Sequence, residues 1–136
     1  MKKIWIVGGV MVAVTVVFWI SCRSSATRDA VGRGQKIYTQ YCLSCHQPDG
    51  GGVSELNPPL KNTAEVVGEE SRLIGIVVNG FSGDADINGN NYTNPMPAFG
   101  PSLKDDEIAD VLTYVRNSFG DKASEISAGQ VKAVRK

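Results

Sequence analysis

The feature that most constrains the fold of this chain is a pair of cysteines followed by a histidine, Cys42-Leu43-Ser44-Cys45-His46. Two thiols three positions apart on a helical turn can each add across a vinyl group of a porphyrin. The next residue then carries an imidazole beneath the ring, where it can bind iron. This five-residue pattern is typical of covalent haem attachment. The sequence therefore predicts thioether bonds through Cys42 and Cys45, and an iron ligand in His46.

Other uses of a Cys-x-x-Cys pair fit the sequence less well. A thioredoxin-like redox pair is expected in a strand–helix–strand context and has no need of a following histidine. A zinc site requires four ligands, and the one remaining cysteine, Cys22, lies in the amino-terminal leader. A disulfide between Cys42 and Cys45 is the plainest alternative. The complete pattern, with its histidine, favours haem over all three.

Met96 is the candidate for a sixth iron ligand. His46 is the only histidine of the chain, and the other methionines, Met1 and Met11, lie in the leader. A proline on each side of Met96 stiffens an extended loop that could hold the sulfur over a ring face. A methionine that only fills a core is expected in a helix or strand instead. A thioether ligand favours ferrous iron and so raises the reduction potential.

From about Val31 to Gly120, these motifs and their order resemble the small single-haem class I cytochrome c domains of bacteria. The resemblance rests on Cys42-Leu43-Ser44-Cys45-His46, on Pro58-Pro59-Leu60, on Met96-Pro97-Ala98-Phe99, and on the run from Asp106 to Arg116. It implies an all-α fold, with three or four helices packed around one covalently bound haem c. It also implies that the Pro58 carbonyl accepts a hydrogen bond from the axial histidine, which fixes the orientation of the imidazole ring.

Hydrophobic spacing predicts a helix from Val31 that delivers Cys42 to the haem. The residues on its apolar face are Gly34, Ile37, Tyr38 and Tyr41. A glycine inside a helix costs about 1 kcal/mol relative to alanine, which suggests that another element approaches closely at Gly34. By the resemblance, that element is the last helix.

Two further helices are predicted downstream. The first runs from Glu69 to Asn79 and stops at Gly80. Its face toward the haem consists of Leu73, Ile76 and Val77. The second has an apolar face formed by Ile108, Val111, Leu112, Val115 and Phe119. Lys104 stands before it, where relatives often place a serine or threonine cap.

The amino terminus has the pattern of an export signal. Lys2 and Lys3 precede seventeen uncharged residues, from Ile4 to Ile20, and such a pattern sends the following chain across the membrane. The sequence Trp19-Ile20-Ser21-Cys22 resembles the bacterial lipobox, which would leave Cys22 as a lipidated first residue. An uncleaved anchor fits equally well, and full release into solution ranks third. Both favoured alternatives tether the haem domain to the cell membrane, on its periplasmic or extracytoplasmic side.

Four segments are therefore expected. They are a signal peptide or membrane anchor (1–22), a polar tether (23–30), the haem domain (31–120) and a mobile tail (121–136). Within the haem domain, Asp84 to Gly89 copies the first half of an EF-hand calcium loop. Pro95 occupies the position where such a site needs glutamate, so a loop with Asx turns is favoured and calcium is unexpected.

The motifs indicate a one-electron carrier and not an enzyme, because His46 and Met96 would saturate the iron and no catalytic base or nucleophile is needed. The charge of the haem domain bears on its partners. Residues 31–120 contain six Lys or Arg and eleven Asp or Glu, a net charge of −5. A docking patch on a redox partner is then expected to be electropositive or largely apolar, and nucleic acid is not a plausible partner. An oxidase, dehydrogenase or reductase would fit, and the chain could serve as its electron-accepting subunit. The alternative is a haem-based ligand sensor, in which Met96 is displaceable or does not bind the iron. A peroxidase is disfavoured, because the chain has no second histidine to assist peroxide cleavage.

Overall fold

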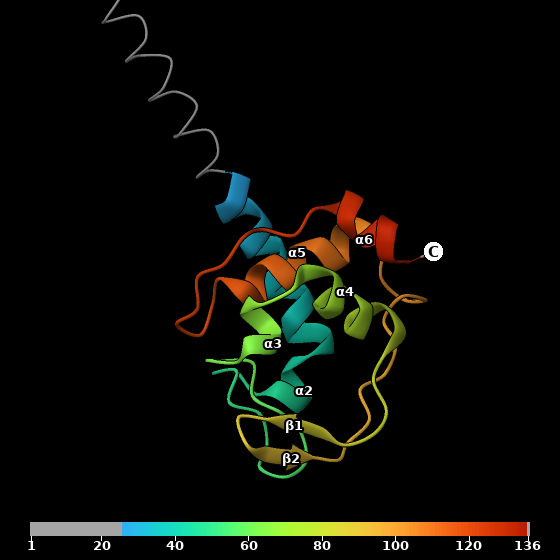
Figure 1. Cartoon of the computed structure of the whole chain (residues 1–136). Coiled ribbons are helices and arrows are strands. Elements are labelled where there is room, and N and C mark those ends of the chain that lie inside the picture. Colours follow the sequence, from blue (N-terminus) through green and yellow to red (C-terminus); the bar gives the residue numbers. More distant parts are fainter. Residues whose placement is uncertain (1–25, 136) are drawn as a thin grey trace, which may run out of the picture.

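The computed structural model describes residues 26–135, which form a small helical domain (Figure 1). An N-terminal helix covers residues 26–41 and is followed by α2 (Leu43–His46), α3 (Ala64–Val67), α4 (Glu70–Asn79), α5 (Asp105–Arg116) and α6 (Ala128–Val134). The only sheet of these residues pairs β1 (Ala85–Ile87) with β2 (Asn90–Tyr92). The predicted all-α class is confirmed. No helix within 26–135 has the length and apolar character to cross a bilayer.

The N-terminal helix packs closely against α5 at Gly34. A β-carbon built on Gly34 would lie 2.7 Å from Cβ of Tyr114 and would collide with the main-chain carbonyl of Asp110. One turn further along, the ring of Tyr38 lies 5.3 Å from that of Tyr114 and 5.5 Å from that of Phe119. The predicted close approach at Gly34 is confirmed, and the helix that approaches it is α5, which is followed by one more helix, α6. The predicted tether is too long, because residues 26–30 already belong to this helix.

The substitution Gly34→Ala is expected to destabilise the domain by about 1–3 kcal/mol, because the added methyl group overpacks the contact with α5. Gly32 lies in the same helix and has no atom within 4 Å of a built β-carbon, so Gly32→Ala is expected to stabilise by up to about 1 kcal/mol through helix propensity alone. Chemical denaturation of both variants measures the difference. Equal effects of the two substitutions would show that the helix crossing tolerates a side chain.

The segment predicted as an Asx-turn loop is largely a β-hairpin. Strands β1 and β2 are antiparallel, with Ala85 opposite Tyr92. The two residues that join them, Asn88 and Gly89, have positive φ angles of 55° and 76°, as the usual two-residue hairpin turn requires. Ile87 and Tyr92 are buried whereas their neighbours in the strands are more exposed. Each strand therefore contributes one buried apolar side chain.

The C-terminal segment, residues 121–135, was expected to be mobile and instead ends in helix α6. Ser127 caps this helix, because its hydroxyl accepts a hydrogen bond from the Gln130 N–H and the Gln130 side chain accepts one from the Ser127 N–H. Val131 has no exposed surface, and α6 packs on both α4 and α5. A single buried valine on a short helix gives little periodicity in the sequence, which explains why the helix was missed.

Candidate functional site

Cys42, Cys45, His46 and Met96 all line one cleft of about 270 Å³. Most of the remaining wall is apolar. Its residues include Leu73, Ile76 and Val77 of α4, as predicted, and Val111, Leu112 and Val115 of α5. Figure 1 shows α2 beside the hairpin, at the end of the domain opposite to α6 and to the start of the N-terminal helix. The fold therefore brings together the four side chains that the sequence analysis selected.

The two cysteines differ in environment although they share one helical turn. The Cys42 N–H donates to the Tyr38 carbonyl at 2.9 Å, and the His46 N–H donates to the Cys42 carbonyl at 2.9 Å, so the N-terminal helix runs almost directly into α2. Both thiols are free, with Cys42 half-buried and Cys45 exposed. Burial, assisted by the neighbouring Cys45, raises the pKa of the Cys42 thiol to about 11. Before haem is attached, burial therefore favours the protonated form of the Cys42 thiol.

His46 is held in one orientation by the Pro58 carbonyl. Its Nδ1 atom lies 3.0 Å from the carbonyl oxygen of Pro58. A carbonyl only accepts hydrogen bonds, so Nδ1 carries the proton and Nε2 keeps a lone pair for a metal. Only 9% of the His46 surface is exposed. Burial lowers the imidazole pKa, and the hydrogen bond to Pro58 opposes that shift. The site therefore favours a neutral imidazole, the form that binds iron.

Main-chain hydrogen bonds fix the loop that follows His46. The Tyr38 hydroxyl donates to the Gln47 carbonyl at 2.6 Å, and the Leu60 N–H donates to the Gly50 carbonyl at 2.8 Å. The first bond ties the start of the loop to the buried Tyr38, and the second closes the loop between Gly50 and Leu60. They keep the Pro58 carbonyl in register with the histidine ring.

The residues around Met96, here called the Met96 segment (residues 94–100), are bonded to the end of α4. Met96 and Phe81 exchange main-chain hydrogen bonds of 2.8 and 2.9 Å. The turn between α4 and Phe81 needs Gly80, which has a φ of +75° and whose built β-carbon would lie 2.6 Å from the Met96 carbonyl oxygen. Further along, the Phe99 N–H donates to the Val77 carbonyl at 2.9 Å. The methionine is thus carried on a fixed main chain at the cleft.

Sequence reasoning missed several residues that complete the cleft. The hairpin contributes Ile87 and Tyr92, and the chain between Met96 and α5 contributes Phe99 and Leu103. The Asn-Gly pair between short alternating segments was a readable hairpin signal. Nothing in the local pattern indicated that the hairpin would face the cysteines, because that placement depends on tertiary packing.

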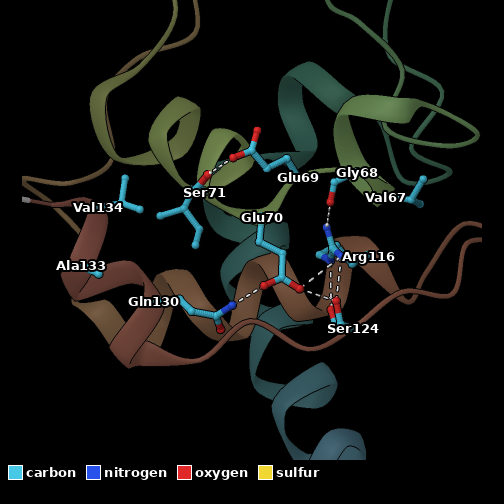
Figure 2. Close-up of a pocket in the computed structure, with 11 residues that line it drawn as sticks. Val67, Gly68, Glu69, Glu70, Ser71, Arg116, Ser124, Gln130, Ala133 and Val134 are labelled. Carbon is cyan, nitrogen blue, oxygen red and sulfur yellow. Dashed lines mark hydrogen bonds and ion pairs between the residues drawn. The ribbon is translucent and has the colours of Figure 1, made fainter.

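A second cavity of about 570 Å³ lies on a different part of the domain, between α4, α5 and α6. Figure 2 shows Glu70 at its centre, with Arg116, Ser124 and Gln130 turned toward it. The Ser124 hydroxyl and the Gln130 amide both donate to the Glu70 carboxylate, and Arg116 Nη2 lies 3.6 Å from it. These groups satisfy one another, so they join the three helices instead of presenting a polar site to a ligand.

The family model for cytochrome c matches residues 31–119. Cytochrome c-552 of Thermus thermophilus is 38% identical over 92 residues, which cover 65% of this chain and 69% of that protein. Cytochrome c6 of Diacronema lutheri is 32% identical over 93 residues, with 66% of this chain and 98% of that protein covered. The fructose dehydrogenase cytochrome subunit of Gluconobacter japonicus is 34% identical over 122 residues, which cover 85% of this chain but 24% of the subunit.

The cleft suits the cofactor that these relatives share. It is mainly apolar, as a porphyrin face requires, and it places two free thiols and a neutral, oriented imidazole at its wall. Cys42, Cys45 and His46 stand in the order that covalent attachment needs. The chain therefore belongs to the cytochrome c family and carries one covalently attached c-type haem.

Proposed function

We propose that Cys42 and Cys45 hold the haem through thioether bonds and that His46 and Met96 bind its iron. The chain is an electron carrier and not itself a catalytic enzyme, as its family membership indicates. The observation that carries the ligand assignment is the convergence of the four side chains on one apolar cleft. The hydrogen bond from His46 Nδ1 to Pro58 supports it further, because it leaves Nε2 free for the metal.

The bound haem supplies a one-electron iron couple, and the protein supplies two ligands in fixed positions. His46 is oriented by Pro58, and Met96 is carried on main chain paired with Phe81. Ligands held in this way can stay in place in both oxidation states, so electron transfer needs little rearrangement of the chain. The soft sulfur of Met96 favours the ferrous state and sets a comparatively high potential.

The carrier role is tested with carbon monoxide. If Met96 occupies the sixth position, the ferrous wild-type protein is expected to take up carbon monoxide only slowly, as the sulfur leaves the iron. The ferric protein is expected to show the near-infrared sulfur-to-iron band. Rapid uptake on mixing, without that band, would contradict the assignment and favour the ligand-sensor alternative.

We propose that the electron donor is a membrane dehydrogenase. The chain resembles the cytochrome subunits of fructose dehydrogenase and of quinone-dependent alcohol dehydrogenase, at 34% and 33% identity. It spans only 24% and 22% of those subunits, so the shared part is a single haem domain. Affinity purification from detergent-solubilised membranes, followed by reduction assays with the co-purified enzyme, tests this partner. Co-purification with an oxidase alone would contradict it.

We also propose that the domain is tethered outside the cytoplasmic membrane by its amino terminus. The leader, with Lys2, Lys3 and Cys22, lies outside the described residues. Support comes from its charge pattern and from the N-terminal helix, whose 16 described residues span roughly 24 Å. That helix begins at the end of the domain opposite to α2 (Figure 1). A tether attached there would leave the haem end open to partners.

Cys22→Ala distinguishes the two forms of tether. If Cys22 is lipidated, the variant is expected to lose the mature lipoprotein form, detected as a change in the mass of the membrane-associated protein. An uncleaved anchor predicts a different result. The variant would stay in the membrane, and its mass would differ from that of the wild type only by the replaced side chain. Recovery of the wild type in the soluble fraction after cell rupture would overturn the tether.

A further inference from the structure

We propose that Arg135, near the end of the C-terminal segment, is a positioning residue for Met96. Its guanidinium clamps the chain between the Met96 segment and α5, and it thereby strengthens the bond between the Met96 sulfur and the iron. The inference rests on the proposed ligation by Met96, but it concerns a residue outside the cleft and outside the family match, which ends at residue 119.

The hydrogen bonds that the Arg135 side chain makes all fall on residues 100–105. Nε donates to the Asp105 carboxylate at 2.6 Å, and Nη2 donates to the Leu103 carbonyl at 2.8 Å. Nη1 donates to the carbonyl of Gly100. Gly100 is the last residue of the Met96 segment and Asp105 is the first residue of α5. One planar, permanently charged group therefore spans the whole connection, and its fork of donors fixes three acceptors relative to one another.

The Met96 segment is consequently held from two sides. At its C-terminal end the N–H groups of Phe99 and Gly100 donate to α4, and the Gly100 bond to the Val78 carbonyl is 3.0 Å long. The Gly100 carbonyl points the other way, to Arg135. Loss of the guanidinium would leave the Gly100 carbonyl without this donor, so the Gly100 end of the segment would keep only its bond to α4. Motion of Gly100 would then be transmitted to Met96 through the few residues that separate them.

Arg135 can act as a clamp because α6 itself is docked. The Arg135 N–H donates to the Val131 carbonyl at 3.0 Å, and the Val131 side chain is fully buried. At the other end of α6, Gln130 donates to Glu70 of α4 (Figure 2). The guanidinium is thus tied through a packed helix to the same α4 that holds the Met96 segment. Both the N–H and the carbonyl of Gly100 are therefore held by groups that are anchored on α4.

The test compares Arg135→Gln with two controls in the full-length, haem-loaded protein. Arg33→Gln removes an arginine that makes a similar pair, with Nε and Nη2 2.5 and 2.7 Å from the Asp110 carboxylate, but on the N-terminal helix. Lys132→Gln removes a positive charge from an exposed position of α6 and leaves the side-chain contacts of Arg135 to Gly100 and Leu103 in place. The readouts are the near-infrared sulfur-to-iron band, the rate of carbon monoxide uptake by the ferrous protein, and the far-ultraviolet circular dichroism of the helices.

We expect Arg135→Gln to speed carbon monoxide uptake by about tenfold, the order of effect that a hydrogen bond from a charged donor has on an opening equilibrium. The near-infrared band should disappear at a lower denaturant concentration than the helical signal does. Arg135→Lys should recover part of the effect, and both controls should match the wild type. The inference is overturned if Arg135→Gln behaves like the wild type, or if either control produces the same acceleration. Absence of the band from the wild type would instead remove the Met96 assignment, and the role of Arg135 with it.

Discussion

Met96→Ala is expected to leave the sixth coordination position of the haem iron without its protein ligand. Removal of the sulfur should abolish the near-infrared sulfur-to-iron band and allow the ferrous protein to bind carbon monoxide on mixing. The reduction potential should fall by on the order of 100 mV, a modest part of the ~0.8 V range that axial ligands span. The direction follows from the preference of a soft thioether for ferrous iron. Absorption spectroscopy and a redox titration measure all three effects.

A matched control is Leu56→Ala. Leu56 is 45% exposed, and its carbonyl accepts a hydrogen bond from the Asn94 N–H at 3.2 Å, so it neighbours the Met96 segment without lining the cleft. The control shortens an apolar side chain by a similar amount and should leave the spectrum and the potential unchanged. If Met96→Ala also matches the wild type, Met96 does not bind the iron, and rapid carbon monoxide uptake by both proteins would support the sensor alternative.

The residues of the candidate site could be selected from the sequence because local motifs mark them, and the structure places them in one cleft. Cys42, Cys45 and His46 are consecutive on one helical turn, and Met96 follows from elimination among three methionines. The faces of α4 and α5 were readable because their apolar residues repeat at the helical period. Gly34 was informative for a similar reason, since a glycine inside a helix calls for a compensating contact.

The burial of Arg116 and the docking of α6 could not be predicted, because both depend on contacts between distant parts of the chain. Arg116 occupies a charged, helical stretch and would ordinarily be assigned to the surface, yet 2% of it is exposed. It is covered because residues 121–135 turn back over α5. The Ser-x-x-Gln pattern at Ser127 and Gln130 is a readable helix start, but it gives no indication of where the helix docks. The role proposed for Arg135 depends on that docking and was equally inaccessible.

Arg116→Met is expected to cause the largest loss of stability among substitutions away from the haem. Arg116 Nη1 donates to the Val66 carbonyl at 2.7 Å and to the Gly68 carbonyl at 3.2 Å. Nε and Nη2 donate to the carbonyl and the hydroxyl of Ser124, both at 2.9 Å. Methionine would fill much of the volume and leave the three carbonyls without these donors. Because each buried unsatisfied acceptor costs about 1–3 kcal/mol, with some relief by water, we expect a loss of about 3–5 kcal/mol.

Comparison with Arg33→Met shows whether the loss of stability depends on the burial of the arginine or on the length of its ion pair. The Arg33–Asp110 pair is short, at 2.5 Å, but 59% of the Arg33 side chain is exposed, whereas Arg116 lies 3.6 Å from Glu70 and 2% of its side chain is exposed. Water can replace the partners of Arg33, so its loss should be far smaller. Glu70→Gln should also have a small effect, because the carbonyl bonds of Arg116 survive it. Urea unfolding of the three holoprotein variants measures the order. Equal losses for Arg116→Met and Arg33→Met would mean that the carbonyls released by Arg116 find other donors, and that the C-terminal segment is not held by this arginine.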